Sequence, residues 1–155
     1  MIEKYFKPIR SSSRNLSIYT EGEIPFVSNS ALNNGVVAYI TADLDKEIIK
    51  EVPCIAVNGF GYATIQTKPF VGSGNGGVYV TALIPKKPMH TIELAYYAAQ
   101  INLQSWRFSY GRRAIKRRLL GQILIKEFEL PKEEYQRLEL EMKEKVLASF
   151  EAMFS

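Results

Sequence analysis

The sequence predicts an α+β fold in which a central, mostly antiparallel sheet packs against a helix and is followed by a long C-terminal helix. The 155 residues are 46% hydrophobic and 12% aromatic, which is enough for one substantial core. Residues 54–85 carry the two-residue periodicity of strands. After Pro88 the period lengthens to the roughly 3.6 residues of a helix. We therefore expect one domain over residues 1–130 and a helix over residues 131–155.

The N-terminal part is predicted to alternate between loops and short strands. Residues 10–34 are rich in Ser, Asn and Gly, whose side chains compete with regular backbone pairing, so we expect surface loops around an extended piece at 24–27. Residues 35–40 have the β-branched density of a strand. The Asn34-Gly35 pair before them is a hairpin signal.

The centre of the sheet is predicted from three segments. Residues 54–58 form an apolar run, residues 62–66 alternate after a Gly-Phe-Gly turn, and residues 77–84 form a further strand. Cys54 is the single cysteine and lies in the apolar run, so we expect a buried, unreactive thiol and no intramolecular disulfide.

Two helices are predicted after the sheet. The first covers residues 91–103 with Thr91 as its N-cap. Its expected buried face consists of Ile92, Ala95, Tyr96, Ala99 and Leu103. The second begins at Pro131, where proline suits the first turn, and its apolar stripes at near-heptad spacing favour pairing with another helix.

The strongest functional signal is the segment R-F-S-Y-G-R-R-A-I-K-R-R at residues 107–118, which has six positive charges in twelve residues and no carboxylate. Residues 1–126 contain 16 Lys and Arg against 8 Asp and Glu, whereas residues 127–155 contain 4 against 8. A basic body of this kind is typical of proteins that bind polyanions. The alternative is a helix over 114–120 with its cations on a solvated face and Ile115 and Leu119 directed inward.

Other motifs are weaker. Residues 72–77 match G-x-G-x-x-G, but a strand follows them, so a flexible sheet loop is favoured over a dinucleotide site. His90 is the only histidine, which disfavours histidine-based catalysis or metal binding. Carboxylates at Asp43, Asp45 and Glu141 leave a small metal-dependent nuclease as an alternative function. We expect no cofactor and no metal.

The order of three segments resembles a target recognition domain of restriction-modification specificity subunits, from type I systems and related type IIB and IIG enzymes. The likeness is carried by residues 21–40, 54–86 and 106–120, followed by a strand, Leu130-Pro131 and a long helix. It covers nearly the whole chain.

The resemblance implies an α/β domain that reads half of a split DNA site, while helices pair and dock methyltransferase subunits. The usual specificity subunit has two such domains, so the chain is expected to be either a half-subunit that dimerises through 131–155 or a fragment or paralogue. No apolar segment approaches the ~18 residues of a membrane span, and the N-terminus lacks the pattern of a signal peptide. We therefore expect a cytoplasmic protein.

The sequence thus predicts sequence-specific binding of double-stranded DNA by a specificity component without an active site of its own, whose partners are methyltransferase subunits and possibly an endonuclease subunit. The predicted DNA-binding side chains are Arg107, Tyr110, Arg112, Arg113, Lys116, Arg117, Arg118, Lys68 and Asn75. Lys86, Lys87, Arg10 and Arg14 are expected to add to the same positive surface. A binder of single-stranded nucleic acid that stacks bases on Phe108 and Tyr110 is a further alternative.

Overall fold

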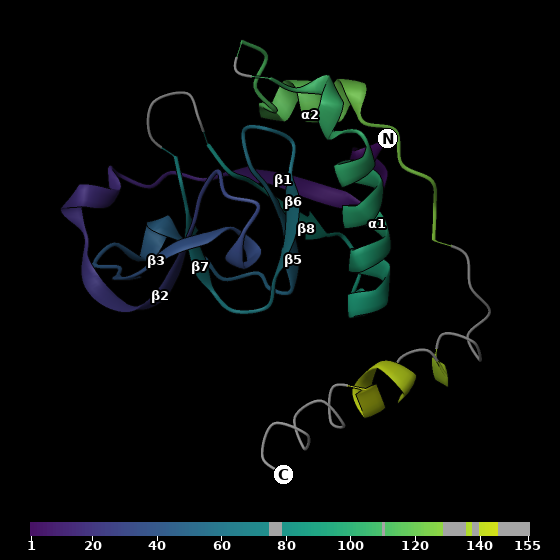
Figure 1. The fold of residues 1–155 in the computed structure, drawn as a ribbon, viewed down its shortest axis with the longest axis horizontal. Coiled ribbons are helices and arrows are strands. Elements are labelled where there is room, and N and C mark those ends of the chain that lie inside the picture. Colours follow the sequence, from purple (N-terminus) through teal and green to yellow (C-terminus); the bar gives the residue numbers. More distant parts are fainter. Residues whose placement is uncertain (75–78, 110, 129–135, 138–139, 146–155) are drawn as a thin grey trace.

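The computed structural model describes residues 1–74, 79–109, 111–128, 136–137 and 140–145. These residues form three layers, two sheets and a helical layer, and Figure 1 shows α1 beside one sheet and α2 above it. The middle layer is an antiparallel sheet with the order β1 (Phe6–Arg10), β8 (Thr81–Pro85), β5 (Cys54–Val57) and β6 (Ala63–Gln66). The outer layer is a mixed sheet with the order β3 (Val36–Thr41), β2 (Thr20–Val27), β7 (Phe70–Gly72) and β4 (Ile48–Ile49).

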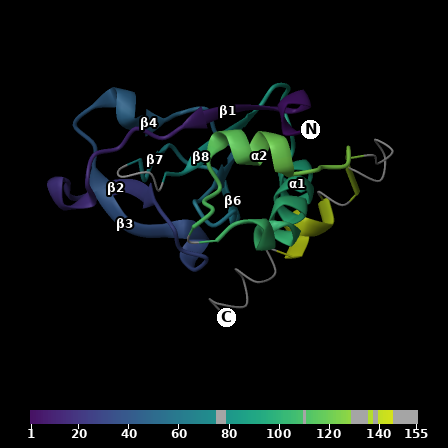
Figure 2. The same cartoon turned by 90° about the horizontal axis from the view of Figure 1, so that it is seen from above.

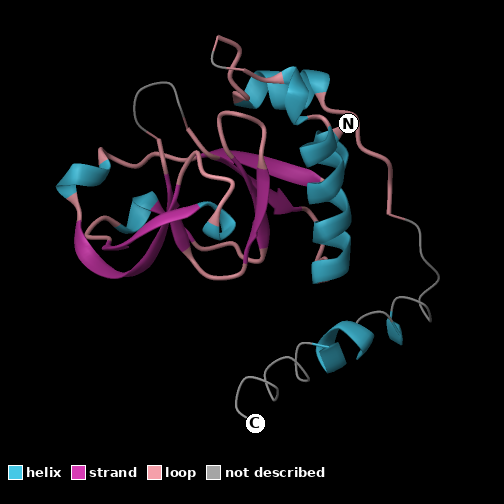
Figure 3. Ribbon diagram, viewed as in Figure 1, coloured by secondary structure: helices cyan, strands magenta, loops and turns pink. Residues whose placement is uncertain are grey.

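The helical layer contains α1 (Thr91–Leu103) and α2 (Lys116–Gln122). Short 3₁₀ turns connect the elements at Ile2–Lys4, Leu16–Ile18, Asn33–Gly35, Asp45–Glu47 and Ser105–Arg107. Figure 3 distinguishes these turns and helices from the strands of the two sheets.

The predicted fold class was wrong in two respects. The strands divide between two sheets and do not form one central sheet. The long C-terminal helix is also not found, because the longest helical run that the structure describes after residue 130 covers only 140–145, and its side chains are exposed. The remainder of that prediction, including pairing of two copies through 131–155, falls largely outside the described residues.

Strand β5 contributes side chains to the cores on both faces of the middle sheet. Its side chains alternate, so that Ile55 and Val57 join the core beneath the helices, whereas Cys54 and Ala56 join the core between the two sheets. A strand buried on both faces reads as a continuous apolar run, without the polar alternation of a half-exposed strand. The predicted buried position of Cys54 is confirmed.

Helix α1 has the predicted bounds but buries a different face. The buried residues of the helix are Leu94, Tyr97, Ala98 and Ile101. Of the predicted set, Tyr96 packs partly buried against the same core, whereas Ile92, Ala95, Ala99 and Leu103 are not part of it. The helix carries two apolar stripes, and periodicity alone did not distinguish them. The N-cap is His90, not Thr91.

The chain after α2 runs in an extended conformation along α1, and Figure 3 shows it as a loop. It is held by side chains of the helix: Tyr97 accepts a hydrogen bond from the N–H of Phe128, and Gln100 and Gln104 bond to the backbone of Lys126 and Leu124. Gln100 and Gln104 are four residues apart on the helix, a rise of about 6.0 Å, and their partners Lys126 and Leu124 are two residues apart in an extended chain, about 6.6 Å. The spacing of the two glutamines therefore matches the spacing of the backbone groups that they bind. The first part of the C-terminal segment is thereby fixed to the domain.

Among the described residues, no helix has the length and apolar character that crossing a bilayer requires.

Candidate nucleic-acid interface

The basic segment is anchored on the turn between β5 and β6. The ring of Phe108 is buried against Gly61, which has a φ of +77° and no space for a Cβ atom beside that ring. Further along the segment, the N–H of Ala114 donates to the carbonyl of Gly59 at 2.6 Å. These two contacts fix the basic segment at both ends of its loop.

The turn itself is built by two asparagines. Oδ1 of Asn58 accepts hydrogen bonds from the N–H groups of Phe60 and Tyr62 at 2.9 and 3.1 Å. Oδ1 of Asn29 accepts from the N–H of Gly59 at 2.9 Å. Both side chains therefore shape the platform under the basic segment, as asparagines commonly do in turns.

Three arginines line one open cleft between this segment and α2. Ser109 and Arg112 exchange two backbone hydrogen bonds at 2.9 and 3.0 Å, which closes a tight loop. The cleft has a volume of about 580 Å³ and is lined by Gly111, Arg112, Arg117, Arg118, Gly121 and Gln122. Seen from above in Figure 2, α2 lies across the top of the molecule with the preceding loop beside it.

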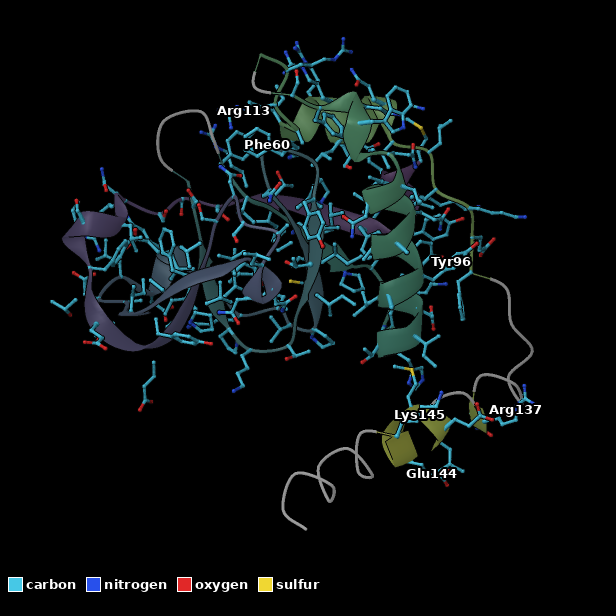
Figure 4. All side chains as sticks on the ribbon, viewed as in Figure 1. Phe60, Tyr96, Arg113, Arg137, Glu144 and Lys145 are labelled. Atoms are coloured by element: carbon cyan, nitrogen blue, oxygen red, sulfur yellow. The ribbon has the colours of Figure 1, made fainter. Side chains whose placement is uncertain are left out.

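Neighbouring cations are oriented by aromatic rings. The guanidinium of Arg113 lies over the ring of Phe60, 4.6 Å from its centroid, and Figure 4 shows the two side chains together to the left of α2. Arg10, at the end of β1, stacks at 4.0 Å on Tyr79, whose hydroxyl accepts a hydrogen bond from the N–H of Lys116. Arg10 therefore belongs to the same surface as α2. Stacking on a ring restricts the orientation of a guanidinium.

The cations at the cleft are not neutralised within the described part of the chain. Arg112, Lys116 and Arg117 are exposed and form no ion pair with a carboxylate there. Arg118 is held differently, because its Nη1 donates to the carbonyl of Arg113 at 3.0 Å. The surface therefore combines one arginine that stabilises the local backbone with at least three cations directed to solvent.

Several predicted residues lie elsewhere. Lys68 follows the end of β6 that pairs with Cys54, whereas Phe60 and Arg113 lie at the opposite end of the β5–β6 hairpin. Arg107 stacks on Trp106 at 4.5 Å and does not line the cleft. Tyr110 and Asn75 fall outside the described residues.

The other lysines and arginines expected on the basic surface are divided. Arg14 is ion-paired with Asp43 and, at 2.8 Å, with the buried carboxylate of Glu47, so its charge is neutralised. Lys86 and Lys87 border a separate pocket of about 410 Å³ at the start of α1. The expectation of one continuous basic surface was therefore too broad.

The glycines of the G-x-G-x-x-G match serve packing in the described part of the loop. A Cβ atom at Gly72 would overlap Ser11, and one at Gly74 would lie 2.6 Å from the carbonyl oxygen of Ser11. The N–H of Gly74 donates a hydrogen bond to Oγ of Ser13 at 2.8 Å. Close approach of two protein segments explains these glycines.

Of the three carboxylates that suggested a nuclease, two are ion-paired with cations and the third is exposed on the short C-terminal helix. Asp43 contacts Arg14, whose hydrogen bond lowers the pKa of the aspartate, and Asp45 is ion-paired with Lys50. Glu141 lies exposed on the 140–145 helix. Within the described ranges, no three His, Cys, Asp or Glu residues come close enough together to hold a metal ion.

Sequence reasoning found the clustered arginines because they are contiguous, but it missed the Gly59–Gly61 platform and the link from Arg10 through Tyr79. The pair Gly59 and Gly61 around an aromatic residue was a signal of close packing that could have indicated the platform.

Comparison with known proteins finds no matching family model, no matching curated protein and no matching solved structure.

Proposed function

We propose that this chain binds double-stranded DNA through the arginine-lined cleft and supplies sequence recognition to a separate restriction-modification methyltransferase or endonuclease. The observation that carries the proposal is the convergence of Arg112, Arg117 and Arg118 on one open cleft, in a segment without a carboxylate. Guanidinium groups bind phosphate and guanine edges with two parallel hydrogen bonds.

The arrangement supports separate roles for the cations that contact phosphates and for the side chains that contact base edges. Exposed Lys116 and Arg117, with Arg113 and Arg10 held on aromatic rings, would neutralise phosphates and set the register of the duplex. Arg112 and Gln122 on the walls of the cleft carry the donors and acceptors that read base edges. The cleft is open, which suits a long polyanion better than an enclosed small molecule.

The proposal assigns catalysis to partner subunits in the cytoplasm. It is supported by the engagement of Asp43 and Asp45 with cations, which leaves them poorly placed to hold a catalytic metal. The protein would therefore act by positioning an enzyme on DNA.

A charge-reversal experiment tests the site. The variant R112E/K116E/R117E changes three exposed side chains, while the control K46E/K86E/K87E makes the same change in net charge on exposed lysines away from the cleft. Arg118 is left intact because it bonds to the backbone of Arg113. Binding is measured by fluorescence anisotropy with duplexes selected from a random pool.

We expect the cleft variant to lose at least a hundredfold in affinity, since each phosphate contact contributes to binding and reversal adds repulsion. The control should lose much less. Equal losses in both variants would show that only net charge matters and would overturn the site. Preference for single strands, or cleavage of plasmid by the isolated chain with Mg²⁺, would favour the alternative functions.

A further inference from the structure

Two arginines of the basic segment and one at the end of β1 lie over aromatic rings, and the rings differ in how much surface they leave open. Arg10 covers Tyr79, Arg113 covers Phe60 and Arg107 covers Trp106. Tyr79 is 9% exposed and Phe60 38%, whereas Trp106 is 73% exposed. An indole so open to water is unusual for a residue that normally buries most of its surface.

Trp106 is also held in place. It lies in the 3₁₀ turn Ser105–Arg107, where the N–H of Arg107 bonds to the carbonyl of Gln104 at 3.1 Å, directly after α1. Phe108, two residues on, is buried against Gly61. The exposed ring is therefore held between the end of α1 and the buried ring of Phe108. Trp106 precedes Arg112, which lines the cleft, by six residues in the sequence.

The Arg107 guanidinium lies 4.5 Å from the centroid of the indole and covers part of it. A flat aromatic surface beside cations is the arrangement with which proteins hold nucleotide bases, because every base offers a π-face and every nucleotide a phosphate. Packing within the domain does not require the ring, since most of its surface is in water.

We propose that Trp106 stacks on a base of the bound DNA, at a step where the duplex is locally unstacked. This inference rests on the proposed function and adds to it a specific residue and a specific deformation of the duplex. A stacking contact of this kind makes affinity depend on how readily a sequence is unstacked, and thus contributes to recognition without a base-edge hydrogen bond.

The single tryptophan makes the contact directly measurable. Duplex DNA is titrated into the full chain while tryptophan emission is recorded with selective excitation, and anisotropy of a labelled duplex is followed in parallel. We expect emission to be quenched in step with the anisotropy, and a duplex with a single-nucleotide bulge to bind more tightly than its fully paired counterpart.

Variants separate stacking from structure. W106A should weaken binding about tenfold, whereas W106F should recover most of the affinity because it keeps a flat ring. W106L, which is apolar but not aromatic, should behave like W106A. The matched control is Y39A, which removes another exposed aromatic, 52% open to water, from β3 on the outer sheet. All four variants should keep the thermal midpoint of the parent.

The outcomes distinguish the two proposals. Binding with unchanged emission, or equal affinities for W106L and W106F, would overturn the stacking contact while leaving DNA binding in place. Absence of duplex binding by the parent chain would overturn both.

Discussion

The side-chain amide of Gln104 forms two hydrogen bonds with the backbone of Leu124, accepting from its N–H at 3.0 Å and donating to its carbonyl at 2.6 Å. Gln100, one helical turn earlier, does the same with Lys126 at 2.6 and 3.0 Å. An extended strand normally satisfies its backbone against another strand, but here two glutamines on a helix take that role. The contact fixes the chain as it leaves α2.

Replacing both glutamines should release this segment. In Q100A/Q104A we expect a loss of about 1–2 kcal/mol in the free energy of unfolding, because the four hydrogen bonds are near solvent and each contributes modestly. Amide hydrogen exchange should show faster exchange at Leu124 and Lys126. The exposed Gln136 supplies the control Q136A, which should leave both amides unchanged. Persistent protection in the double variant would show that packing of Ile123 and Ile125 alone holds the segment.

The turn beneath the basic segment should be sensitive to one methyl group. Gly61→Ala places a Cβ atom against the Phe108 ring at a positive φ, so we expect a loss of more than about 1 kcal/mol in stability and weaker DNA binding. Gly121→Ala is the matched comparison, since nothing lies within 4 Å of its Cβ position and α2 gains helix propensity of up to about 1 kcal/mol. Chemical denaturation of both variants checks the opposite signs. A neutral Gly61→Ala would mean that Phe108 does not need its present position.

The contrast between α1 and the sheets shows what could be predicted from the sequence. The bounds of α1 follow from local periodicity, which the residues themselves carry. Its buried face was mispredicted because two apolar stripes compete and the choice depends on the segment that covers one of them. The division into two sheets depends on pairings between distant strands, such as Phe26 with Val71, which no local pattern specifies.

The same distinction applies to the candidate site. Arg112, Arg117 and Arg118 are close in sequence, so their convergence was predictable. Arg10 belongs to the basic surface at α2 through its long-range contact with Tyr79. Lys68 does not belong to that surface, because it follows the opposite end of the β5–β6 hairpin. Charge composition indicates a basic protein, but only tertiary contacts decide which cations share a surface.

The thiol of Cys54 should be inert in the folded protein. Burial, with a smaller contribution from the negative charge of Glu51, raises its pKa to about 12, so the reactive thiolate is scarce at neutral pH. A thiol reagent at pH 8 should find no reactive group in the native chain and one in denaturant. Rapid labelling of the native chain would show that the sheets open around β5.

Acid should destabilise the outer sheet through Glu47. Burial alone would raise the pKa of this carboxyl, but hydrogen bonds from Arg14 and Tyr19 outweigh it and hold the pKa below its ordinary value of 4.5. A carboxyl with a lowered folded pKa stabilises the native state above the unfolded pKa and loses that contribution as the pH falls toward the folded pKa. Urea unfolding should therefore show stability declining below about pH 4.5.

The variant E47Q isolates that contribution. It should be less stable than the parent at pH 7, because Arg14 loses the buried one of its two carboxylate partners, and its stability should vary less with pH. The comparison is D45N, which removes a carboxylate from an exposed pair with Lys50 and should change little. If E47Q kept the full acid dependence of the parent, other carboxylates would be responsible.

The salt dependence of DNA binding should count the cations that contact phosphate. Each neutralised phosphate contributes about −0.9 to the slope of log Kobs against log salt concentration, so contacts by Arg10, Arg113, Lys116 and Arg117 predict a slope of about −3 to −4. Arg117→Ala should make the slope shallower by about 1, because the side chain is exposed and its loss removes one contact. Lys46→Ala, on the outer sheet side, should leave the slope unchanged. A slope near zero, or equal effects of the two substitutions, would show that phosphates are not bound at the cleft, since counterion release is local to the contacted surface.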